Sequence, residues 1–383
     1  MSGSHGSIRF NRHEFSGAFG DLGTDLPLIV GMILAVKLDS ASVLILFGLM
    51  QVMTALIYRM PMPVQPLKAM AALVITQKIA GNTLYGAGLA IGVVMLLLTV
   101  TGLVAWLVRM IPKPVIRGIQ FGLGLQLATI ALRDYVRSDG ASGYWLAGAG
   151  FAVTVLLIGR KQYPSAVILV LLGAVYAFAF KMDPGTITRA AGFRLPQLHV
   201  PGWGDILTGF VVLALPQIPL SLANSILATR QIAEDLFPER QITARRISFT
   251  YSLMNLTNPF FGGVPTCHGA GGMAGHYAFG GRTGGSVIIY GSMYLVLGLF
   301  LSTGFDKVIN IFPMPILGVL LTFEGLTLMG LIRDITQDRS SFLIAVLVGF
   351  IAGTLPYGYL VGMVVGAALV ALAHKNLVSF GQG

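Results

Sequence analysis

Cysteines and charged residues are scarce in this chain of 383 residues, of which 10% are charged and 55% hydrophobic. Because a soluble domain carries about 25% charged residues, this composition excludes a soluble globular protein. The single cysteine, Cys267, excludes a disulfide framework and a metal site built from several cysteines. The polar start of the chain and the long apolar run after it argue against a cleaved signal peptide.

What the chain does have is a series of apolar stretches that repeatedly approach the ~20 residues needed to span a bilayer core. Its 49 glycines suit the close packing of membrane helices. The net charge of +10 could indicate a nucleic-acid-binding protein. Basic residues also gather in the cytoplasmic loops of membrane proteins, and we favour this explanation. The expected surroundings are therefore a lipid bilayer, with no nucleic-acid partner.

Fourteen apolar segments predict an all-α polytopic membrane protein with fourteen spans. Their approximate bounds are residues 15–36, 41–58, 66–79, 84–108, 114–132, 143–159, 164–181, 206–227, 246–261, 267–277, 285–303, 315–331, 340–354 and 357–376. The third and tenth are too short to cross alone, and each follows a Pro- or Gly-rich stretch, Pro61–Pro66 or Gly262–Thr266. Paired short segments are typical of a transporter binding site. We expect two half-helices, each preceded by a short extended segment.

Lysine and arginine predict the orientation of the chain in the membrane. If the N-terminus is cytoplasmic, the loops on that side carry more than twice as many Lys and Arg residues as the loops on the other side. Since positive residues mark cytoplasmic loops, both termini are expected in the cytoplasm and the protein in the cell membrane.

The two halves of the chain share a proline-rich motif. Pro112–Gly118 recurs as Pro313–Gly318, about 200 residues further on. An odd number of spans per half requires the second copy to be inverted in the membrane. We therefore expect an N-terminal repeat over residues 1–195 and an inverted C-terminal repeat over residues 196–383, each with seven spans.

Isolated carboxylates within the apolar segments are functional candidates, because charge is costly inside a bilayer. Asp21 and Asp25 lie four residues apart on the first span and share one helical face. Pro27 removes a backbone donor, which predicts a bend or an opening of that helix. Glu324 lies in the twelfth span. All three carboxylates are candidates for coupling transport to protons, and the alternative is that they tether neighbouring helices.

The eighth segment carries a polar stripe in an otherwise apolar helix. Gln217, Ser221 and Asn224 stand at i, i+4 and i+7, on one face of a regular helix. Pro216 and Pro219 each free a backbone carbonyl nearby. Such a face suits a polar cavity that holds a substrate, and the alternative is a set of hydrogen bonds between helices.

The starts of the two half-helices suit an anion. Gln65 and Lys68 stand at the start of the third segment. The tenth begins with Thr266, Cys267, His268 and Gly269. Helix N-termini bind anions, and two of them together with one lysine supply about two positive charges, which match a tetrahedral dianion. Alternatively, Lys68 pairs with Asp21 or Asp25.

His268 has three interpretations: it pins the backbone, donates to the substrate or carries a proton. Cys267 and His268 are not a metal pair, because adjacent residues on a helix do not converge. No metal site and no cofactor is expected.

Four motifs, in this order along the chain, resemble the molybdate transporter family, a branch of the sulfate permease superfamily. They are Phe19–Pro27, Pro63–Ala69, Pro216–Ser225 and Cys267–Gly275. The resemblance implies a fold of seven plus seven spans like that of the uracil permeases, with core and gate domains and the substrate between the third and tenth half-helices. Sulfate permeases carry a cytoplasmic STAS domain, and no such domain is expected here, as in the molybdate branch.

These observations predict a secondary active transporter that imports molybdate, with tungstate as a competitor. Sulfate has the same charge and shape, so a sulfate transporter is the nearest alternative. A nucleobase permease would share the fold, and a passive anion channel would need no coupling. An enzyme is not expected, because no nucleophile–base pair stands out. Proton coupling and a homodimer are left open.

Overall fold

The computed structural model describes residues 7–104, 106, 112–157, 165–181, 191–355, 357–375 and 377. In the first half of the chain the elements are α1 (Arg12–Gly17), α2 (Leu22–Val36), α3 (Ser40–Tyr58), β1 (Val64–Pro66), α4 (Lys68–Gln77), α5 (Gly81–Val100), α7 (Lys113–Ile130), η1 (Ala131–Tyr135), α8 (Gly140–Leu157) and α9 (Ser165–Phe180). The described part of this half is therefore helical apart from one short strand.

The second half of the chain is likewise mostly helical, with one short strand. Its elements are α11 (Trp203–Gly209), η2 (Phe210–Ala214), α12 (Leu215–Leu220), η3 (Ser221–Ala228), α13 (Thr229–Leu236), α14 (Ala244–Thr257), η4 (Asn258–Phe261), β2 (Thr266–His268), α15 (Ala270–Ala278), α16 (Gly285–Ile311), α17 (Met314–Gly330), η5 (Leu331–Ile335), α18 (Arg339–Thr354) and α19 (Gly358–His374). Each of the fourteen segments expected from the sequence contains a helix.

Seven helices in the described ranges are long and apolar enough to cross a membrane. Shorter apolar helices include α2, α18 and α19. These helices, with the low charge of the chain, define a multi-pass membrane protein. Four basic residues that enter the orientation prediction, Arg109, Arg160, Lys161 and Arg189, lie outside the described residues.

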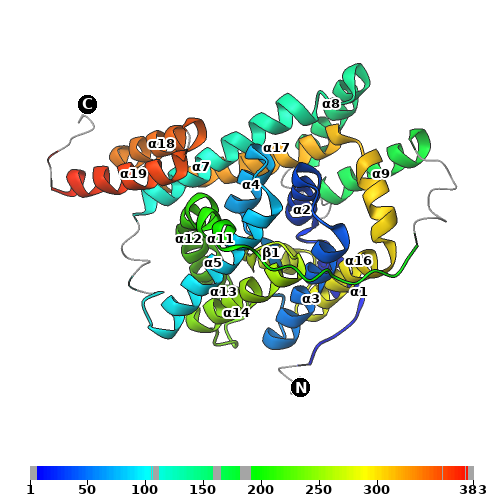
Figure 1. Ribbon diagram of the computed structural model, residues 1–383, viewed down its shortest axis with the longest axis horizontal. Coiled ribbons are helices and arrows are strands. Elements are labelled where there is room, and N and C mark those ends of the chain that lie inside the picture. The colour runs from blue at the N-terminus through cyan, green and yellow to red at the C-terminus, as the bar shows by residue number, and fades with distance from the viewer. Residues whose placement is uncertain are drawn as a thin grey trace.

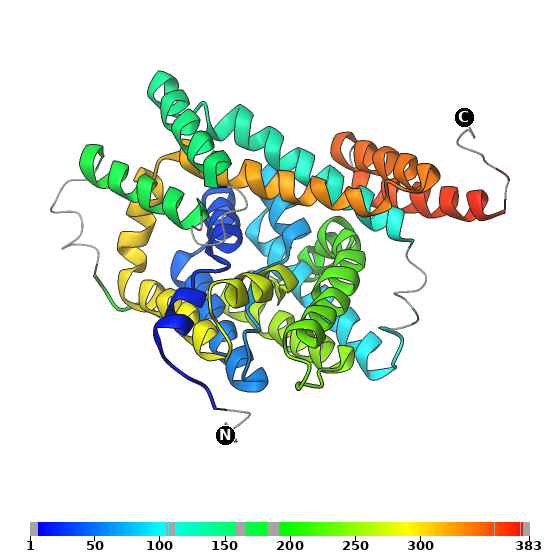
Figure 2. The same ribbon diagram turned by 180° about the vertical axis from the view of Figure 1, so that it is seen from behind.

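The helices form two layers, which Figures 1 and 2 show from opposite sides. One layer, here called the α7–α17 layer, contains α7, α8, α9, α17, α18 and α19, and within it α7 packs against both α17 and α18. The other, here called the strand layer, contains the remaining helices and both strands; there α3 packs on α16 and α5 packs on α14 and α11. Helices α2 and α4, which pack together, stand next to the α7–α17 layer (Figure 1).

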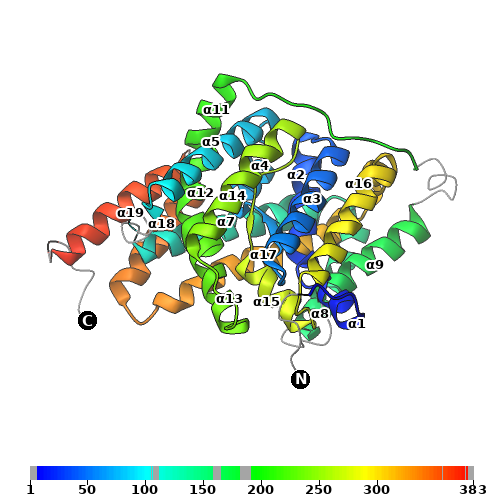
Figure 3. The same ribbon diagram turned by 90° about the horizontal axis from the view of Figure 1, so that it is seen from below.

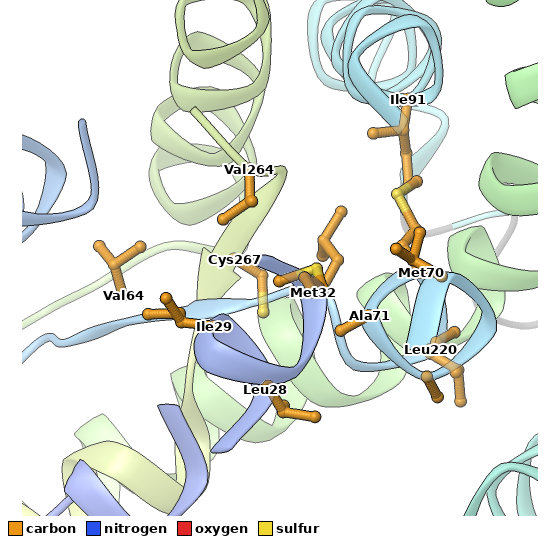
Figure 4. Close-up of a cluster of buried hydrophobic side chains, with 14 of the residues drawn as sticks. Leu28, Ile29, Met32, Val64, Met70, Ala71, Ile91, Leu220, Val264 and Cys267 are labelled. Atoms are coloured by element: carbon orange, nitrogen blue, oxygen red, sulfur yellow. The ribbon is translucent and has the colours of Figure 1, made fainter. Parts of the chain in front are cut away.

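An apolar core surrounds the two strands. Figure 4 shows Leu28, Ile29 and Met32 of α2 gathered with Met70 and other side chains near the strands. These side chains are almost completely buried. Burial of apolar area on this scale holds the short strands and half-length helices in place, since neither is stable alone.

The two halves of the chain are joined by an extended segment that Figure 3 shows running across one end of the molecule before α11. Backbone hydrogen bonds attach it to the strand layer, from Gly192 N to Phe300 O at 2.8 Å and from His199 N to Phe260 O at 2.7 Å. Gln197 N also donates to Ser42 Oγ at 3.0 Å. The connection is therefore fixed on the helices that it crosses.

Of the two outcomes predicted at Pro27, a bend or an opening of the first span, the opening is wrong and the bend stays a prediction. Helix α2 continues through Pro27, and the interruption lies between α1 and α2, where Gly20 N and Leu22 N make turn bonds. Gly20 has a physical reason to be there, because a side chain at this position would lie 2.3 Å from the backbone of Gly275 in α15. The first span is thus interrupted where its backbone packs directly against the backbone of α15.

Candidate functional site

The centre of the site is the antiparallel pair of β1 and β2, in which Gln65 lies opposite Cys267 and Val64 opposite His268. Each strand leads into a short helix, α4 of 10 residues and α15 of 9 residues. Leu67 N donates to Pro265 O at 3.0 Å, so the pairing continues to the start of α4. The third and tenth segments are therefore an extended piece and a short helix each, as the sequence predicts.

Two buried amide side chains hold the strands in equivalent ways. Gln51 of α3 binds both backbone groups of Val64, with Nε2 to the carbonyl at 2.7 Å and Oε1 to the N–H at 2.8 Å. Asn255 of α14 does the same for Thr266, at 2.7 and 3.0 Å. A three-residue strand leaves backbone groups unpaired, and these side chains satisfy them. Neither residue was expected at the site from the sequence.

Gln217 occupies the N-terminus of α4. Its Oε1 accepts from Ala69 N at 2.9 Å and from Met70 N at 3.4 Å, while its Nε2 donates to Ser221 Oγ at 3.1 Å. Ser221 is in turn 2.8 Å from the hydroxyl of Tyr251. Two of the free N–H groups at the start of α4 are thus bound by a side chain.

The predicted polar face of the eighth segment is only partly formed. A π-helix covers Ser221–Ala228 and takes more residues per turn than an α-helix. Asn224 and Ser225 therefore both line the cavity described below, whereas Ser221 is fully buried against Tyr251. An i, i+4, i+7 pattern assumes a regular helix, which this segment is not.

The start of α15 differs from that of α4. The residue before its first turn, Gly269, has no side chain that could accept a hydrogen bond from the N–H groups of that turn. A side chain added at Gly271 would meet no atom within 4 Å, whereas one added at Gly269 would lie 2.2 Å from Gln65. One added at Gly272 would lie 2.1 Å from a carboxylate oxygen of Asp21. Gly269 and Gly272 thus leave room for the side chains of Gln65 and Asp21, whereas Gly271 faces open space.

Lys68 and Glu324 form an ion pair between the two layers, with Nζ 2.6 Å from Oε1. The lysine side chain is 27% exposed and the glutamate 7%. Thr24 Oγ1 donates to the other carboxylate oxygen at 3.5 Å. Lys68 therefore does not pair with Asp21 or Asp25, the partners considered from the sequence, but with a residue of α17.

The two aspartates of the first span have separate partners. Asp21 accepts from Gln65 Nε2 with both oxygens, at 2.6 and 2.8 Å. One oxygen of Asp25 accepts from the hydroxyl of Tyr290 at 3.0 Å, and the other has no hydrogen-bond partner among the described residues. Both carboxylates are buried. Asp21 thus orients Gln65, and Asp25 lies deeper, against α16.

His268 and Thr266 are both buried in the strand layer. The Nε2 atom of His268 is 2.6 Å from Thr250 Oγ1, and its ring packs edge-on against Tyr58 with centroids 5.5 Å apart. The hydroxyl of Thr266 accepts from Asn258 Nδ2 at 3.1 Å. These contacts attach β2 to α14, to the end of α3 and to η4.

A cavity of about 320 Å³ lies between the layers. From the strand layer, its lining includes seven of the predicted substrate residues. They are Gln65, Lys68, Gln217, Asn224, Cys267, His268 and Gly269. From the other side, Arg117, Gln120 and Thr327 line it. From the sequence, Arg117 counts only among the charges of the cytoplasmic loops, and Gln120 is not expected at the site.

The cavity can hold a small anion. Lys68 provides a cation, and the uncapped N-terminus of α15 adds partial positive charge and N–H donors. Among the described residues, no group of three His, Cys, Asp or Glu side chains could hold a metal ion. The groups proposed to bind an anion here are therefore the lysine and the backbone N–H groups just named.

The fold and this cavity define a membrane transporter for anions. The fold is shared with the transmembrane domain of the cyanobacterial bicarbonate transporter BicA, at a TM-score of 0.65 and 16% identity over 91% of this chain and 99% of that one. It is shared also with the murine anion transporter Slc26a9 in its inward-facing state, at a TM-score of 0.67 and 11% identity over 97% of this chain and 70% of that one. At these identities the similarity concerns the fold alone.

The chain belongs to the family described as "Molybdate transporter of MFS superfamily", which it matches over residues 13–127 and 209–328. It is 34% identical to Molybdate transporter 2 of Arabidopsis thaliana over 87% of this chain and 81% of that protein. It is 33% identical to Molybdate transporter 1 of the same plant, over 90% and 87%. The resemblance seen in the four sequence motifs is therefore confirmed, as is the expectation that the protein is not an enzyme.

Proposed function

We propose that this protein is a secondary active transporter that imports molybdate, which binds as a tetrahedral dianion between Lys68 and the start of α15. The observation that carries the proposal is the cavity between the layers, which is lined by Lys68 and by Ala270 and Gly271 of the first turn of α15. Gln65, Asn224, Cys267 and Gly269 complete the substrate site. Gln217 and His268 also line the cavity, and we assign to them, with the buried Ser221 and Thr266, the positioning of α4 and β2.

Glu324 is the proposed coupling residue. Without substrate, the charges of Lys68 and Glu324 neutralise each other at 2.6 Å. A dianion that binds Lys68 competes with this carboxylate. Glu324 is nearly buried, and a buried carboxylate that loses its partner is unstable as an anion, so it takes up a proton. Anion binding would then be linked to proton uptake.

Asp21 and Asp25 are weaker coupling candidates. Both carboxylates have contacts inside the strand layer, Asp21 with Gln65 and Asp25 with Tyr290. An anion bound at Lys68 would displace neither of them from a cation. We therefore assign Asp21 to the positioning of Gln65, and Asp25 to the packing of α2 on α16.

The proposal includes fourteen spans in two inverted repeats, residues 1–195 and 196–383, with the strand layer as core and the α7–α17 layer as gate. The antiparallel strand pair supports it, as do the equivalent roles of Gln51 and Asn255. Packing also comes in matching pairs, α3 on α16 and α5 on α14. The proposed location is the cell membrane, with both termini in the cytoplasm.

Uptake of labelled molybdate into proteoliposomes tests this function. We expect molybdate to accumulate, and excess tungstate to abolish this uptake, because the site selects its ligand by charge and tetrahedral shape. Sulfate is the main competitor to measure, since it is a smaller dianion of the same shape. Nucleobases should be tested as competitors too, because this chain is 26% identical, over 65% of its own length, to the nucleobase transporter PlAzg2 of Paenibacillus larvae. Uptake that uracil blocks and tungstate does not would overturn the proposal.

A further inference from the structure

Two polar residues of α7, Arg117 and Gln120, line the cavity on the side opposite Lys68. Neither was expected at the site from the sequence. Arg117 is 17% exposed, and Gln120 is fully buried. They stand one helical turn apart, and Arg117 Nη1 donates to Gln120 Oε1 at 2.8 Å. The α7–α17 layer therefore presents its own polar group to the cavity.

The contact with Arg117 determines which way the amide of Gln120 points. A guanidinium carries only donors, so the amide atom that faces it must be the oxygen. The Nε2 atom then points elsewhere, and it is buried without a hydrogen-bond partner among the described residues. A buried amide group normally has its hydrogen bonds satisfied. Gln120, one of the residues that line the cavity, thus has a buried donor without a partner among the described residues.

The charge around Arg117 also favours an anion. Arg117 binds Asp334 through Nε at 2.9 Å and Nη2 at 2.5 Å, and Lys113 Nζ lies 2.9 Å from the same carboxylate. Two cations share one carboxylate, so the cluster keeps a net positive charge. The bidentate pair also fixes the guanidinium in place. A fixed cation beside an unused N–H donor is suited to an oxyanion.

We propose that Gln120 Nε2 and Arg117 form a second anion-binding station, on the gate side of the cavity, for the same tetrahedral oxyanion. This inference rests on the proposed function. The cavity of about 320 Å³ equals the liquid volume of roughly ten water molecules, so an oxyanion has room to move between Lys68 and Gln120. The first station belongs to the strand layer and the second to the α7–α17 layer. The anion is thus held from both layers.

Three variants test the station by equilibrium binding of molybdate and of tungstate to the purified full chain. Gln120→Glu keeps the acceptor for Arg117 and replaces the unused donor with an anionic oxygen. Gln120→Leu removes the donor without adding charge. Gln126→Leu is the matched control, because this glutamine of the same helix does not line the cavity and is already bonded, at 2.8 Å to the hydroxyl of Tyr359 and at 3.2 Å to Gly353 O.

We expect Gln120→Glu to weaken binding about tenfold or more and Gln120→Leu severalfold, as for the loss of a hydrogen bond to a charged group. Gln126→Leu should lower the melting temperature and leave the affinity unchanged. Wild-type affinity in both folded Gln120 variants would overturn this inference and assign the donor to water alone. If the wild-type protein binds no oxyanion in the same assay, the proposed function itself fails.

Discussion

Lys68 at the start of α4 and Glu324 in the middle of α17 are 256 positions apart in the chain and form an ion pair with an N–O distance of 2.6 Å. This contact joins the two layers at the wall of the cavity. The lysine proposed to bind the substrate is thus paired with a carboxylate of the other layer. The charges of Lys68 and Glu324 therefore cancel each other.

Replacing Lys68 should abolish substrate binding. Lys68→Ala removes the only side-chain cation among the proposed core-side ligands and leaves Glu324 as an unpaired negative charge beside the cavity. Loss of a cation that binds a desolvated anion costs about 2–5 kcal/mol of binding free energy, and repulsion by Glu324 adds to this, so molybdate affinity should fall by at least about a hundredfold. Titration calorimetry on the purified variant measures it. Lys68→Ala with wild-type affinity would show that the anion binds elsewhere.

Replacing Glu324 should uncouple transport from protons. Glu324→Gln keeps the shape of the side chain but cannot exchange a proton. We expect the variant to bind molybdate, and its uptake to be independent of external pH. Uptake by the wild type should rise as the external pH falls, because protonation of Glu324 frees Lys68 for the anion. The control is Asp25→Asn, which should keep this pH dependence. An unchanged pH profile in Glu324→Gln would exclude Glu324 as the carrier.

Substitutions of Gln217 and of Asn224 should have different effects, the first on thermal stability and the second on molybdate binding. Gln217→Leu removes the acceptor of two buried N–H groups at the start of α4, and one unsatisfied buried group costs about 1–3 kcal/mol. Thermal unfolding in detergent should therefore show a lower melting temperature. Asn224→Ala should leave the melting temperature unchanged and weaken molybdate binding, since Asn224 lines the cavity. The reverse pattern would contradict these assignments.

Two neighbouring glycines of α15 provide a matched pair. A methyl group at Gly272 would lie 2.1 Å from Asp21 Oδ2 and 2.8 Å from Pro63 Cγ, whereas one at Gly271 meets nothing within 4 Å. Gly272→Ala should therefore lower the yield of folded protein, at a cost of about 1–3 kcal/mol or more. Gly271→Ala should fold normally, which size-exclusion profiles of both variants would show. Equal behaviour of the two would mean that Asp21 moves aside.

The sequence predicted the elements of this fold well, because helix length, proline and glycine act locally. The short third and tenth segments could be identified from apolar stretches that were too short and from the prolines before them. The polar face of Gln217 and Asn224 was harder to predict, since the π-helix after Leu220 changes the residues per turn. No local pattern in the sequence indicates such a stretch.

The partners of the charged residues could not be predicted from the sequence. Contacts between positions hundreds of residues apart, such as Lys68 with Glu324, depend on how the layers pack. Arg117 stands beside a loop and was counted there as a charge that sets orientation. Only the packing of α7 on α17 places it and Gln120 at the cavity. Motif and composition therefore predicted residues that line the cavity from the strand layer, and none of those that line it from the α7–α17 layer.

Cys267, the one cysteine of the chain, lines the cavity opposite Gln65. A small thiol-reactive reagent can therefore modify a single known position in the unaltered protein, without first replacing other cysteines. The thiol is buried, so the rate of modification measures how often the cavity opens to water. An oxyanion that occupies the cavity should slow this reaction, and an assay of labelling with time then follows the opening and closing of the site during transport.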